Sequence, residues 1–395
     1  MPRTILHVDL DAFFCAVEEQ RDPPLRGKAF AVGGNVEGRG VVSSCSYPAR
    51  RFGVCSAMPM VRALALCPDL LRLPTSFPAY RAASHAVMQR LRARTPMVEQ
   101  ISIDEAFLDV SELSTSGGML AQQLQAQIRE ELGLPCSIGV ATNKLVAKVA
   151  TDVGKASARS DGPPNAICTV PPGVEAAFLA HLPAIALWGV GTKTAERLAA
   201  LGLHTIGDIA AWPSASLERR FGQHGRALAR HARGLDDRPV IIEHAAKSVS
   251  RETTFPRDVE DVETLQRTDH AQAADVGKRL RRAEMVGTTV KLRLRWSDFT
   301  TLTRQATLPR PTAHDAEIAT AALHLLDQVW PTGDSVRLIG VGVTGLCSPS
   351  RQLSLWESER SANTERDRHL QITVASLRDR YGYNLFRWGS DVPSR

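Results

Sequence analysis

The sequence lacks the features that mark membrane, secreted and zinc-binding proteins. No apolar run approaches the roughly 18 residues that a membrane span needs, and the N-terminus has no signal-peptide core. The seven cysteines are odd in number and include no C-x-x-C spacing, which argues against a disulfide framework and a zinc site. These absences predict a soluble, cytoplasmic protein with reduced thiols and no membrane contact.

Extremes of composition and internal repeats are missing as well. The 395 residues include 43% hydrophobic and 23% charged residues, close to the globular average. This length predicts two to four domains with apolar cores. The net charge of +6 indicates a polyanionic partner, although a basic protein without such a partner fits that charge equally well.

The order of the predicted elements indicates a multidomain α/β (α+β) chain. Its first part mixes strands and helices, its middle is all helical with glycine punctuation, and its third part returns to strands with two helices. After residue 345 the composition turns polar. Among the individual elements, we expect a strand over residues 4–10, a strand over 99–110, a helix over 143–153, a loop over 154–164 and a weak helix near 367–381.

Three acidic residues lie within apolar strand sequence. Asp9 ends the first predicted strand, and Asp104 and Glu105 fall between the apolar neighbours Ile101 and Phe107. Carboxylates in such surroundings cost free energy unless cations lie beside them. With two Mg²⁺ they would form an oxygen-ligand site of the kind that phosphoryl transfer uses. Surface acids at strand ends are the alternative, since either motif alone is common.

Five segments of the chain carry longer motifs. They read DLDAFFCAVE from Asp9, YPARRFGV from Tyr47, SIDEAFLD from Ser102, SIGVATNK from Ser137 and KSVSRE from Lys247. In this order, and over about residues 4–345, they resemble the motifs of the Y-family DNA polymerases. The subgroup to which they are most similar is the bacterial DNA polymerase IV type.

The resemblance implies a right-hand polymerase with a ferredoxin-like palm, small fingers, an all-helical helix-hairpin-helix thumb and a βαββαβ little-finger domain. It also implies template-directed, error-prone addition of dNTPs to a primer 3′-OH by two-metal-ion nucleotidyl transfer, in translesion synthesis and DNA repair. The expected boundaries are palm 1–11 and 75–165, fingers 12–74, thumb 166–234, linker 235–246, little finger 247–346 and C-terminal tail 347–395.

Two other functions fit parts of the sequence. A catalytically silent relative could act as a DNA- and clamp-binding scaffold, although the intact acidic residues argue against it. A helix-hairpin-helix repair nuclease or glycosylase would share a thumb-like segment, but the N-terminal motifs argue against that function.

The resemblance assigns roles to individual residues of the site. Catalysis and the binding of two Mg²⁺, or of Mn²⁺, fall to Asp9, Asp104 and Glu105 together with the carbonyl of Leu10, whereas Asp11 receives no metal. Phe14 would be the steric gate that excludes a 2′-hydroxyl, with a core aromatic as the alternative. The residues assigned to nucleotide binding are Phe13, Phe14, Ser44, Tyr47, Arg50 and Lys155.

Basic side chains near the site allow a second interpretation. A guanidinium such as that of Arg50 suits phosphate because it forms paired, charge-assisted hydrogen bonds. Lys144 and Lys148 are four residues apart and share a helix face. The two lysines fit an ordinary solvated stripe, so only Lys155 receives a role at the triphosphate.

Two further segments are expected to follow a DNA backbone without reading its sequence. Residues 188–198 resemble a helix-hairpin-helix, in which glycines open a helix whose N-terminus favours anions. Residues 291–296 alternate strictly between basic and apolar side chains, which predicts a strand with one basic face. A glycine turn between packed helices and a solvated sheet face are the alternatives. The residues assigned to DNA are Gly189, Gly191, Lys193, Lys291, Arg293 and Arg295.

The polar tail contains one short motif. Residues 352–356 read QLSLW and resemble the pentapeptide that binds the bacterial sliding clamp, which prefers Phe where Trp356 stands. Its contacts would be Gln352, Leu353, Leu355 and Trp356, with the apolar side chains as anchors. Packing of the tail onto the body of the protein is the alternative. The expected partners are therefore primer–template DNA, dNTP and the sliding clamp, for a monomer associated with the nucleoid.

Overall fold

The structure is a computed structural model, and it describes residues 2–158, 161–331, 333–349, 373 and 377. The chain divides into two compact units, Met1–His244 and Ala245–Arg395. This division falls inside the predicted linker at residues 235–246. Among the described residues, no helix is both long and apolar enough to cross a bilayer.

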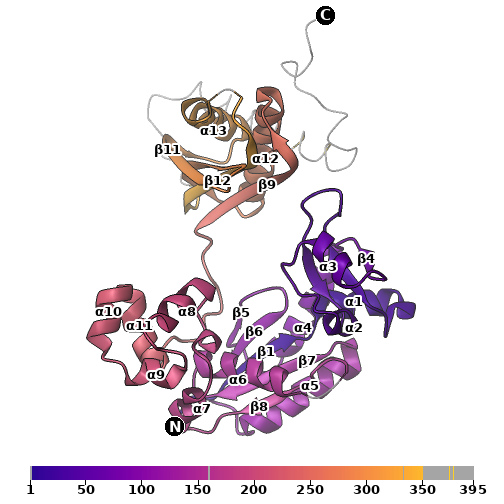
Figure 1. Cartoon of the computed structure of the whole chain (residues 1–395), viewed down its shortest axis with the longest axis vertical. Helices are drawn as coiled ribbons and strands as arrows, with labels where there is room; N and C mark the ends of the chain where they lie inside the picture. The colour runs from indigo at the N-terminus through magenta and orange to yellow at the C-terminus, as the bar shows by residue number, and fades with distance from the viewer. Residues whose placement is uncertain (1, 159–160, 332, 350–372, 374–376, 378–395) are drawn as a thin grey trace, which may run out of the picture. The chain divides into compact units, whose positions relative to one another are not determined.

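A five-stranded sheet forms the centre of the first unit (Figure 1). Its strand order is β5-β6-β1-β7-β8, and β1 is antiparallel to both β6 and β7. With helices α4 and α5, the first four strands have the βαββαβ order of a ferredoxin-like fold, which confirms the predicted palm. The elements are β1 (Ile5–Leu10), α4 (Phe77–Arg92), β5 (Val98–Gln100), β6 (Glu105–Asp109), α5 (Gly117–Leu132), β7 (Cys136–Ala141), α6 (Lys144–Ser157) and β8 (Ile167–Thr169).

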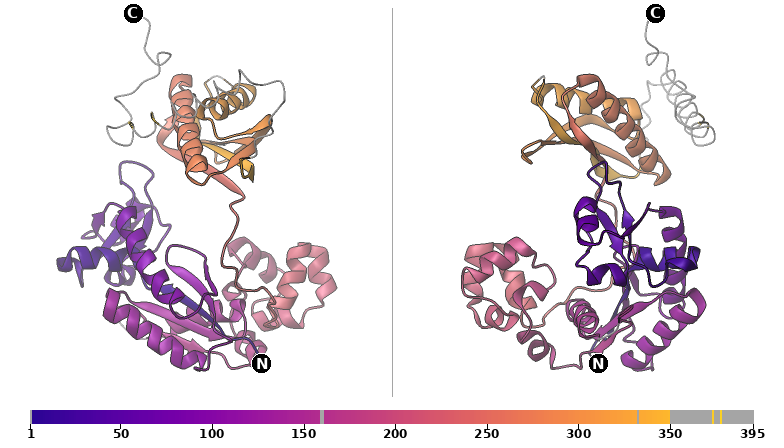
Figure 2. Two further views of the ribbon diagram at one scale, coloured as in Figure 1. Left: turned by 180° about the vertical axis from the view of Figure 1, so that it is seen from behind. Right: turned by 45° about the vertical axis from the view of Figure 1, so that its right-hand side comes forward.

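The two faces of this sheet pack against different helices. Leu6, Val8 and Leu10 of β1 join a core cluster with buried residues of α4 and α5, and α5 runs along the sheet in Figure 2. Because side chains alternate along a strand, Ile5, His7 and Asp9 point to the other face. There His7 Nδ1 lies 2.8 Å from the hydroxyl of Thr151 on α6. The alternation thus directs Asp9 toward helix α6.

Helix α6 lies directly on strand β7 at Gly139. A Cβ at this position would be 2.0 Å from the carbonyl oxygen of Ala147 and 2.6 Å from the backbone nitrogen of Thr151, so the close approach requires glycine. The start of the helix is fixed by Asn143, whose side chain accepts a hydrogen bond of 3.0 Å from the backbone N–H of Val146.

The loop predicted over residues 154–164 is wrong in its first turn, since α6 continues to Ser157. Gly154, which favoured a helix end, faces strand β8 instead. A Cβ there would lie 3.2 Å from that of Ala166 and 3.3 Å from that of Cys168. The glycine therefore permits packing and does not end the helix. As a result, Lys155 lies in the last turn of α6.

The fingers contain a small sheet with the order β3-β2-β4, in which β2 is antiparallel to β3 and parallel to β4. A core cluster of their own, which includes Met60 and Cys67, holds these elements together. The elements are α1 (Phe13–Arg21), η1 (Pro23–Leu25), β2 (Phe30–Gly33), β3 (Val42–Cys45), α2 (Tyr47–Arg51), α3 (Met60–Leu66) and β4 (Leu71–Leu73).

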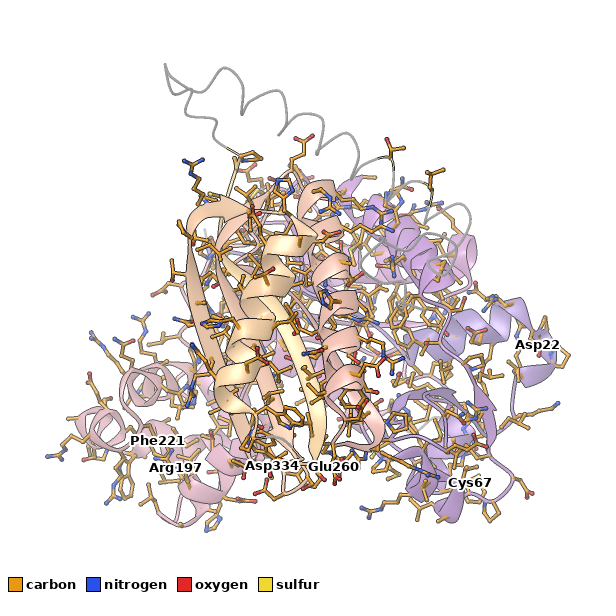
Figure 3. All side chains as sticks on the ribbon, turned by 90° about the horizontal axis from the view of Figure 1, so that it is seen from above. Asp22, Cys67, Arg197, Phe221, Glu260 and Asp334 are labelled. Carbon is orange, nitrogen blue, oxygen red and sulfur yellow. The ribbon has the colours of Figure 1, made fainter. Side chains whose placement is uncertain are left out.

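Five short α-helices and one 3₁₀ helix form the predicted thumb. Arg197 lies over the ring of Phe221, 4.5 Å from its centroid, and ties α8 to α10 (Figure 3). The predicted start at residue 166 differs from the structure, because β8 pairs in parallel with β7 and extends the palm sheet. The elements are α7 (Glu175–Ala180), η2 (Ala184–Ala186), α8 (Thr192–Ala199), α9 (Ile206–Ala211), α10 (Ser214–Phe221) and α11 (Gln223–His231).

The second unit has the βαββαβ order predicted for the little finger. Its sheet has the order β11-β10-β12-β9 with every pair antiparallel, and α12 and α13 lie side by side against it (Figure 3). The elements are β9 (Ser248–Val259), α12 (Val262–Arg282), β10 (Val286–Trp296), β11 (Thr301–Thr312), α13 (Asp315–Val329) and β12 (Val336–Cys347).

Candidate active site

The predicted acidic residues meet at one end of the palm sheet. Asp9 and Glu105 are register partners on β1 and β6. The strand predicted over residues 99–110 is in fact two strands, which are joined by a turn at residues 101–104. The backbone N–H of Leu10 donates to the carbonyl of Asp104 over 3.0 Å. The sheet therefore assembles all four predicted metal-binding residues in one place.

Ser102 organises the turn that carries Asp104. Its hydroxyl accepts from the backbone N–H of Asp104 (3.1 Å) and of Glu105 (2.9 Å), and donates to Asp104 Oδ1 over 2.5 Å. A side chain that binds its own backbone in this way competes with strand pairing, which explains why one strand becomes two.

Two lysines of α6 lie against the carboxylates. Lys155 Nζ is 2.5 Å from Asp9 Oδ1, and Lys148 Nζ is 3.1 Å from Glu105 Oε1 and 3.6 Å from Asp9 Oδ2. The interpretation of Lys148 as part of a solvated stripe is therefore wrong. Its spacing of seven residues from Lys155, two helical turns, was the signal that could have placed both lysines on one face.

Lys144 is not solvated either. Its ammonium is buried and lies 2.7 Å from Glu99 Oε2 on strand β5. The same oxygen accepts from the backbone N–H of Ile241 (2.9 Å), and the other accepts from the ring of His244 (3.1 Å). This buried ion pair therefore fastens the last residues of the first unit to the palm.

The pKa values of the two facing carboxyls move apart. Burial alone would raise the pKa of Asp9, but the Lys155 ammonium beside it brings that pKa below its ordinary value. Burial and the hydrogen bond with Asp9 raise the pKa of Glu105 to about 6. In the pH range where Glu105 begins to take up a proton, Asp9 therefore stays ionised.

The donor atoms at this site suit a hard divalent cation. In the part of the chain that the structure describes, no group of three or more His, Cys, Asp or Glu side chains is arranged to hold a metal ion. The ammonium groups of Lys148 and Lys155 supply positive charge to Asp9 and Glu105. Adjacent carboxylates and a strand-end carbonyl are nevertheless the oxygen ligands that Mg²⁺ and Mn²⁺ prefer.

Asp11 has a role that the sequence did not reveal. Its fully buried carboxylate accepts from the hydroxyl of Ser137 over 3.0 Å and from the backbone N–H of Asn165 over 3.0 Å. It also lies 3.2 Å from Lys155 Nζ. Asp11 therefore holds Lys155 in position and fixes the segment that follows α6. The alternation of Asp9 and Asp11 was the only sequence signal for this shared face.

Phe14 presents its ring on a firm aromatic support. It stacks on Tyr80 with centroids 4.2 Å apart and planes 11° apart, and Phe77 meets its edge. The hydroxyl of Tyr80 donates to Glu18 over 2.6 Å. Phe13, in contrast, is only 2% exposed in the palm core, so any nucleotide contact from it would involve its backbone.

The predicted triphosphate residues of the fingers lie together on α2 and β3. Arg50 stacks its guanidinium over the ring of Tyr47, 4.7 Å from the centroid, and its Nε donates to the carbonyl of Cys45 over 3.3 Å. Burial, followed by the charge of Asp11, raises the pKa of the Tyr47 phenol, so this group stays a neutral donor. Ser44 is buried beside them.

The glycines predicted to contact DNA in the thumb lie in the turn that leads into helix α8. Gly189 has a φ of +96°, and Gly191 is the N-cap of α8. A Cβ at either glycine would meet no atom within 4 Å, so their backbones face open space. Lys193 is exposed in the first helical turn, where backbone N–H groups have no acceptor within the helix.

The basic strand of the little finger is β10, and its alternation is as predicted. Leu292 and Leu294 are 1% exposed, while Lys291, Arg293 and Arg295 are on the opposite face. The basic face of β10 continues onto β9 with one acidic side chain. Glu252 of β9 lies on the same face, and Arg293 Nη1 reaches its carboxylate over 3.0 Å.

The residues predicted to bind the sliding clamp belong to the C-terminal tail. Gln352, Leu353, Leu355 and Trp356 lie outside the described residues. Of the helix predicted near residues 367–381, only residues 373 and 377 are described, and both are helical.

Comparison with known proteins identifies the family. Residues 8–152 match the impB/mucB/samB family, residues 246–355 match the C-terminal domain of that family, and residues 185–236 match the thumb domain of DNA polymerase-iota. DNA polymerase IV of Dehalococcoides mccartyi (strain CBDB1) is 37% identical over 391 residues, which are 98% of this chain and 97% of the relative. The chain belongs to the Y family of DNA polymerases.

Other relatives of this Y-family polymerase agree. DNA polymerase IV of Methanoculleus marisnigri is 42% identical over 349 residues, which are 87% of this chain and 94% of the relative. A solved Y-family DNA polymerase chimera is 26% identical, covers 88% of this chain and 100% of its own, and has a TM-score of 0.77. The insertion ternary complex of Dbh DNA polymerase, with the same identity and coverage, has a TM-score of 0.62.

Family membership decides between the three predicted functions. The protein is a DNA-directed DNA polymerase of the kind that carries out translesion synthesis. None of the relatives named above supports the catalytically silent scaffold, and the nuclease or glycosylase alternative is wrong.

Proposed function

We propose that this Y-family polymerase extends a DNA primer with dNTPs at the site formed by Asp9, Asp104 and Glu105. The observation that carries the proposal is the register pairing of Asp9 with Glu105, beside the ammonium groups of Lys148 and Lys155. Solved relatives named as ternary complexes support DNA and an incoming nucleotide as the two ligands.

The metal ions would be two Mg²⁺, or Mn²⁺, held by Asp9, Asp104, Glu105 and the carbonyl of Leu10. When bound, they would lower the pKa of the primer hydroxyl and stabilise the charge on the transferred phosphate and the leaving pyrophosphate. We expect Asp9 and Asp104 to serve both ions and Glu105 to serve the one at the primer hydroxyl.

The chain's own cations would bind the triphosphate. Arg50 offers paired hydrogen bonds, and its stacking on Tyr47 limits the conformations it must lose on binding. Lys155 lies beside Asp9 and Asp11. When the nucleotide binds, its ammonium would give up the contact with Asp9 for one with a phosphate oxygen and would keep the contact with Asp11. Lys148 would then balance the remaining negative charge of Glu105.

Sugar selection would depend on Phe14. Its ring is held by the parallel ring of Tyr80, which is itself anchored through Glu18. A 2′-hydroxyl would have to displace this supported ring, whereas a deoxyribose would not. The discrimination would therefore come from repulsion, not from a contact that a ribonucleotide lacks.

The remaining partners follow from the two DNA-binding predictions and the tail. The hairpin at Gly189 and Gly191 and the basic face of β10 would bind phosphates of the primer–template. Residues 352–356 would bind the sliding clamp. We expect a monomer that acts in the cytoplasm at the nucleoid.

Primer extension by two variants tests the site. Asp104→Ala and Glu105→Ala should each abolish extension with Mg²⁺ and leave the affinity for primer–template DNA unchanged. Glu131→Gln, at an exposed acid of α5, is the matched control and should extend primers like the unmodified protein. Extension by either site variant at more than a few per cent of the control rate would remove these residues from the proposed site.

A further inference from the structure

A groove opens on the little-finger unit between strand β11 and helix α13. Its volume is about 640 Å³, within the range of clefts that hold ligand groups. Ala306 and Leu308 line it from β11, and Thr320 and Ala321 line it from α13. The polymerase function described above uses none of these residues.

The groove exists because small side chains lie where the sheet ends. β11 is an edge strand, and Ala306 pairs with the fully buried Val290, so it points to the helix-covered face. An alanine on each wall leaves space that larger side chains would fill. Pro309 and Pro311 lack backbone N–H groups, which weakens this edge for strand pairing. An occupant would therefore be held by its side chains.

The chain leaves the little finger at the same end of the sheet as the groove. Cys347 ends β12 and pairs with Val286, and the next residue of β10, Gly287, pairs with Thr312 at the end of β11. β12 and β11 are two strand spacings apart, which is about 10 Å. Residues 348–352 span up to about 17 Å when extended, so the residues that follow them come within reach of the groove.

The residues within reach match the groove in character. Leu353, Leu355 and Trp356 are the large apolar side chains of residues 348–359, and they are flanked by Arg351 on one side and by acidic residues on the other. The groove walls carry complementary groups. Arg310 and His324 suit the acidic Glu357 and Glu359 of the tail sequence, and Glu317 suits the basic Arg351.

We propose that residues 353–356 of the chain's own tail dock in the groove between β11 and α13. The tether is short, so the local concentration of the segment is on the order of millimolar, and docking with a Kd of about 0.2 mM or less keeps the groove mostly occupied. The same residues are those proposed to bind the sliding clamp. The inference rests on that proposed function. It adds that the groove and the clamp compete for the same segment. Only the undocked fraction of the polymerase would then bind the clamp.

Binding of a labelled peptide tests the docking without any clamp. A chain that ends at residue 349 should bind a fluorescent peptide of residues 350–359, with a Kd of at most about 0.2 mM. The full chain should bind it at least about fivefold more weakly, because its own tail occupies the groove. Thr320→Trp, which fills the groove, should abolish binding in the shortened chain. Ala271→Trp, at an exposed position of α12, a helix that contributes no residue to the groove lining, should not.

Three results would overturn the docking. The first is no peptide binding by the shortened chain, and the second is equal binding by the full chain. The third is equal effects of Thr320→Trp and Ala271→Trp when both variants keep the thermal unfolding of the unmodified protein. Self-association of the full chain that depends on residues 353–356 would also contradict it, because the occupant would then be a second copy.

Clamp affinity tests the competition separately. Full-length Thr320→Trp should bind the sliding clamp of the same organism about five- to tenfold more tightly than the unmodified chain, while Ala271→Trp should bind it as the unmodified chain does. Equal affinities for all three proteins would contradict the competition. If none of the three binds the clamp, the proposed clamp role fails, and the peptide result alone decides the docking.

Discussion

Asp9 and Glu105 face each other as register partners on antiparallel strands, and each also contacts Lys148. The sheet itself therefore creates the acidic site, because a slip of one residue in the pairing would turn Asp9 toward the apolar face under α4 and α5. The alternation of apolar side chains along β1 fixes the register of the pairing. The register in turn places Asp9 beside Glu105 and the two lysines.

The support behind Phe14 leads to a prediction on sugar selection. Phe14→Ala should lower the preference for dNTP over rNTP by at least about tenfold, because no ring would oppose the 2′-hydroxyl; this corresponds to about 1.4 kcal/mol. Tyr80→Phe keeps the stacked ring and loses only its bond to Glu18, so it should keep most of the preference. Ratios of kcat/KM for one dNTP and its rNTP measure both effects, and an unchanged ratio for Phe14→Ala would exclude the gate.

A buried acid in the little finger predicts a pH dependence of stability. Asp269 on α12 is fully buried, neither of its oxygens has a hydrogen-bond partner in the described part of the chain, and burial raises its pKa to about 7. The folded state therefore binds this proton more tightly than the unfolded state does. The stability of the little finger should fall as the pH rises from about 4 to about 7, by at most about 4 kcal/mol for a shift of about 3 units.

The variant Asp269→Asn removes the titrating group and keeps its shape. The loss of stability between pH 5 and pH 8 should then flatten, and the little finger should be more stable at pH 8 than in the unmodified chain. Denaturant unfolding of the whole chain, followed through the little-finger transition, measures this. Asp275→Asn, at a partly exposed position on the same helix, should leave the pH slope unchanged.

The buried ion pair of Lys144 and Glu99 predicts an asymmetric response to mutation. Lys144→Ala leaves Glu99 charged and buried, so the first unit should lose about 3 kcal/mol of unfolding free energy. Replacement of both partners, as Lys144→Met with Glu99→Gln, should cost less than the single change. Arg90→Ala, which breaks the more exposed pair with Glu131, should cost less than about 1 kcal/mol. A double variant less stable than Lys144→Ala would contradict this account.

Much of the fold could be predicted from the sequence because its signals are local. The apolar run before Asp9 and the alternation in β10 each specify a strand, and the motifs imply the order of the parts. Lys148 shows the limit of this approach, since a lysine on an amphipathic helix looks the same whether its face is solvated or lies over two carboxylates. Asp11 was missed because its burial depends on Ser137 and Asn165, which are far from it in sequence.

Two errors have different physical causes. Gly154 has a low helix propensity and predicted a helix end, yet it lies within α6 because the helix packs closely on β8. The turn at residues 101–104 was read as strand because its residues include apolar ones, while the hydroxyl of Ser102 decides the geometry. At Gly154 tertiary packing outweighs helix propensity, and at residues 101–104 a local side-chain hydrogen bond outweighs the apolar strand pattern.

The contact at Gly139 yields a further prediction. Gly139→Ala would force α6 away from β7, because the new Cβ would meet the Ala147 carbonyl at 2.0 Å. The variant should be destabilised by about 1–3 kcal/mol. Its kcat should fall as well, because Lys148 and Lys155 would move with the helix. Thermal unfolding and single-nucleotide incorporation measure the two effects, and full activity in a destabilised variant would contradict the link between them.

Gly139 also bears on attempts to build such a site elsewhere. The two ammonium groups can reach the acids only because nothing separates the helix that carries them from the strand beneath it. A design that copies Asp9, Glu105, Lys148 and Lys155 onto another sheet would therefore fail if its helix did not pack equally close to the strand. In this polymerase the spacing between charges is set by a residue that has no side chain at all.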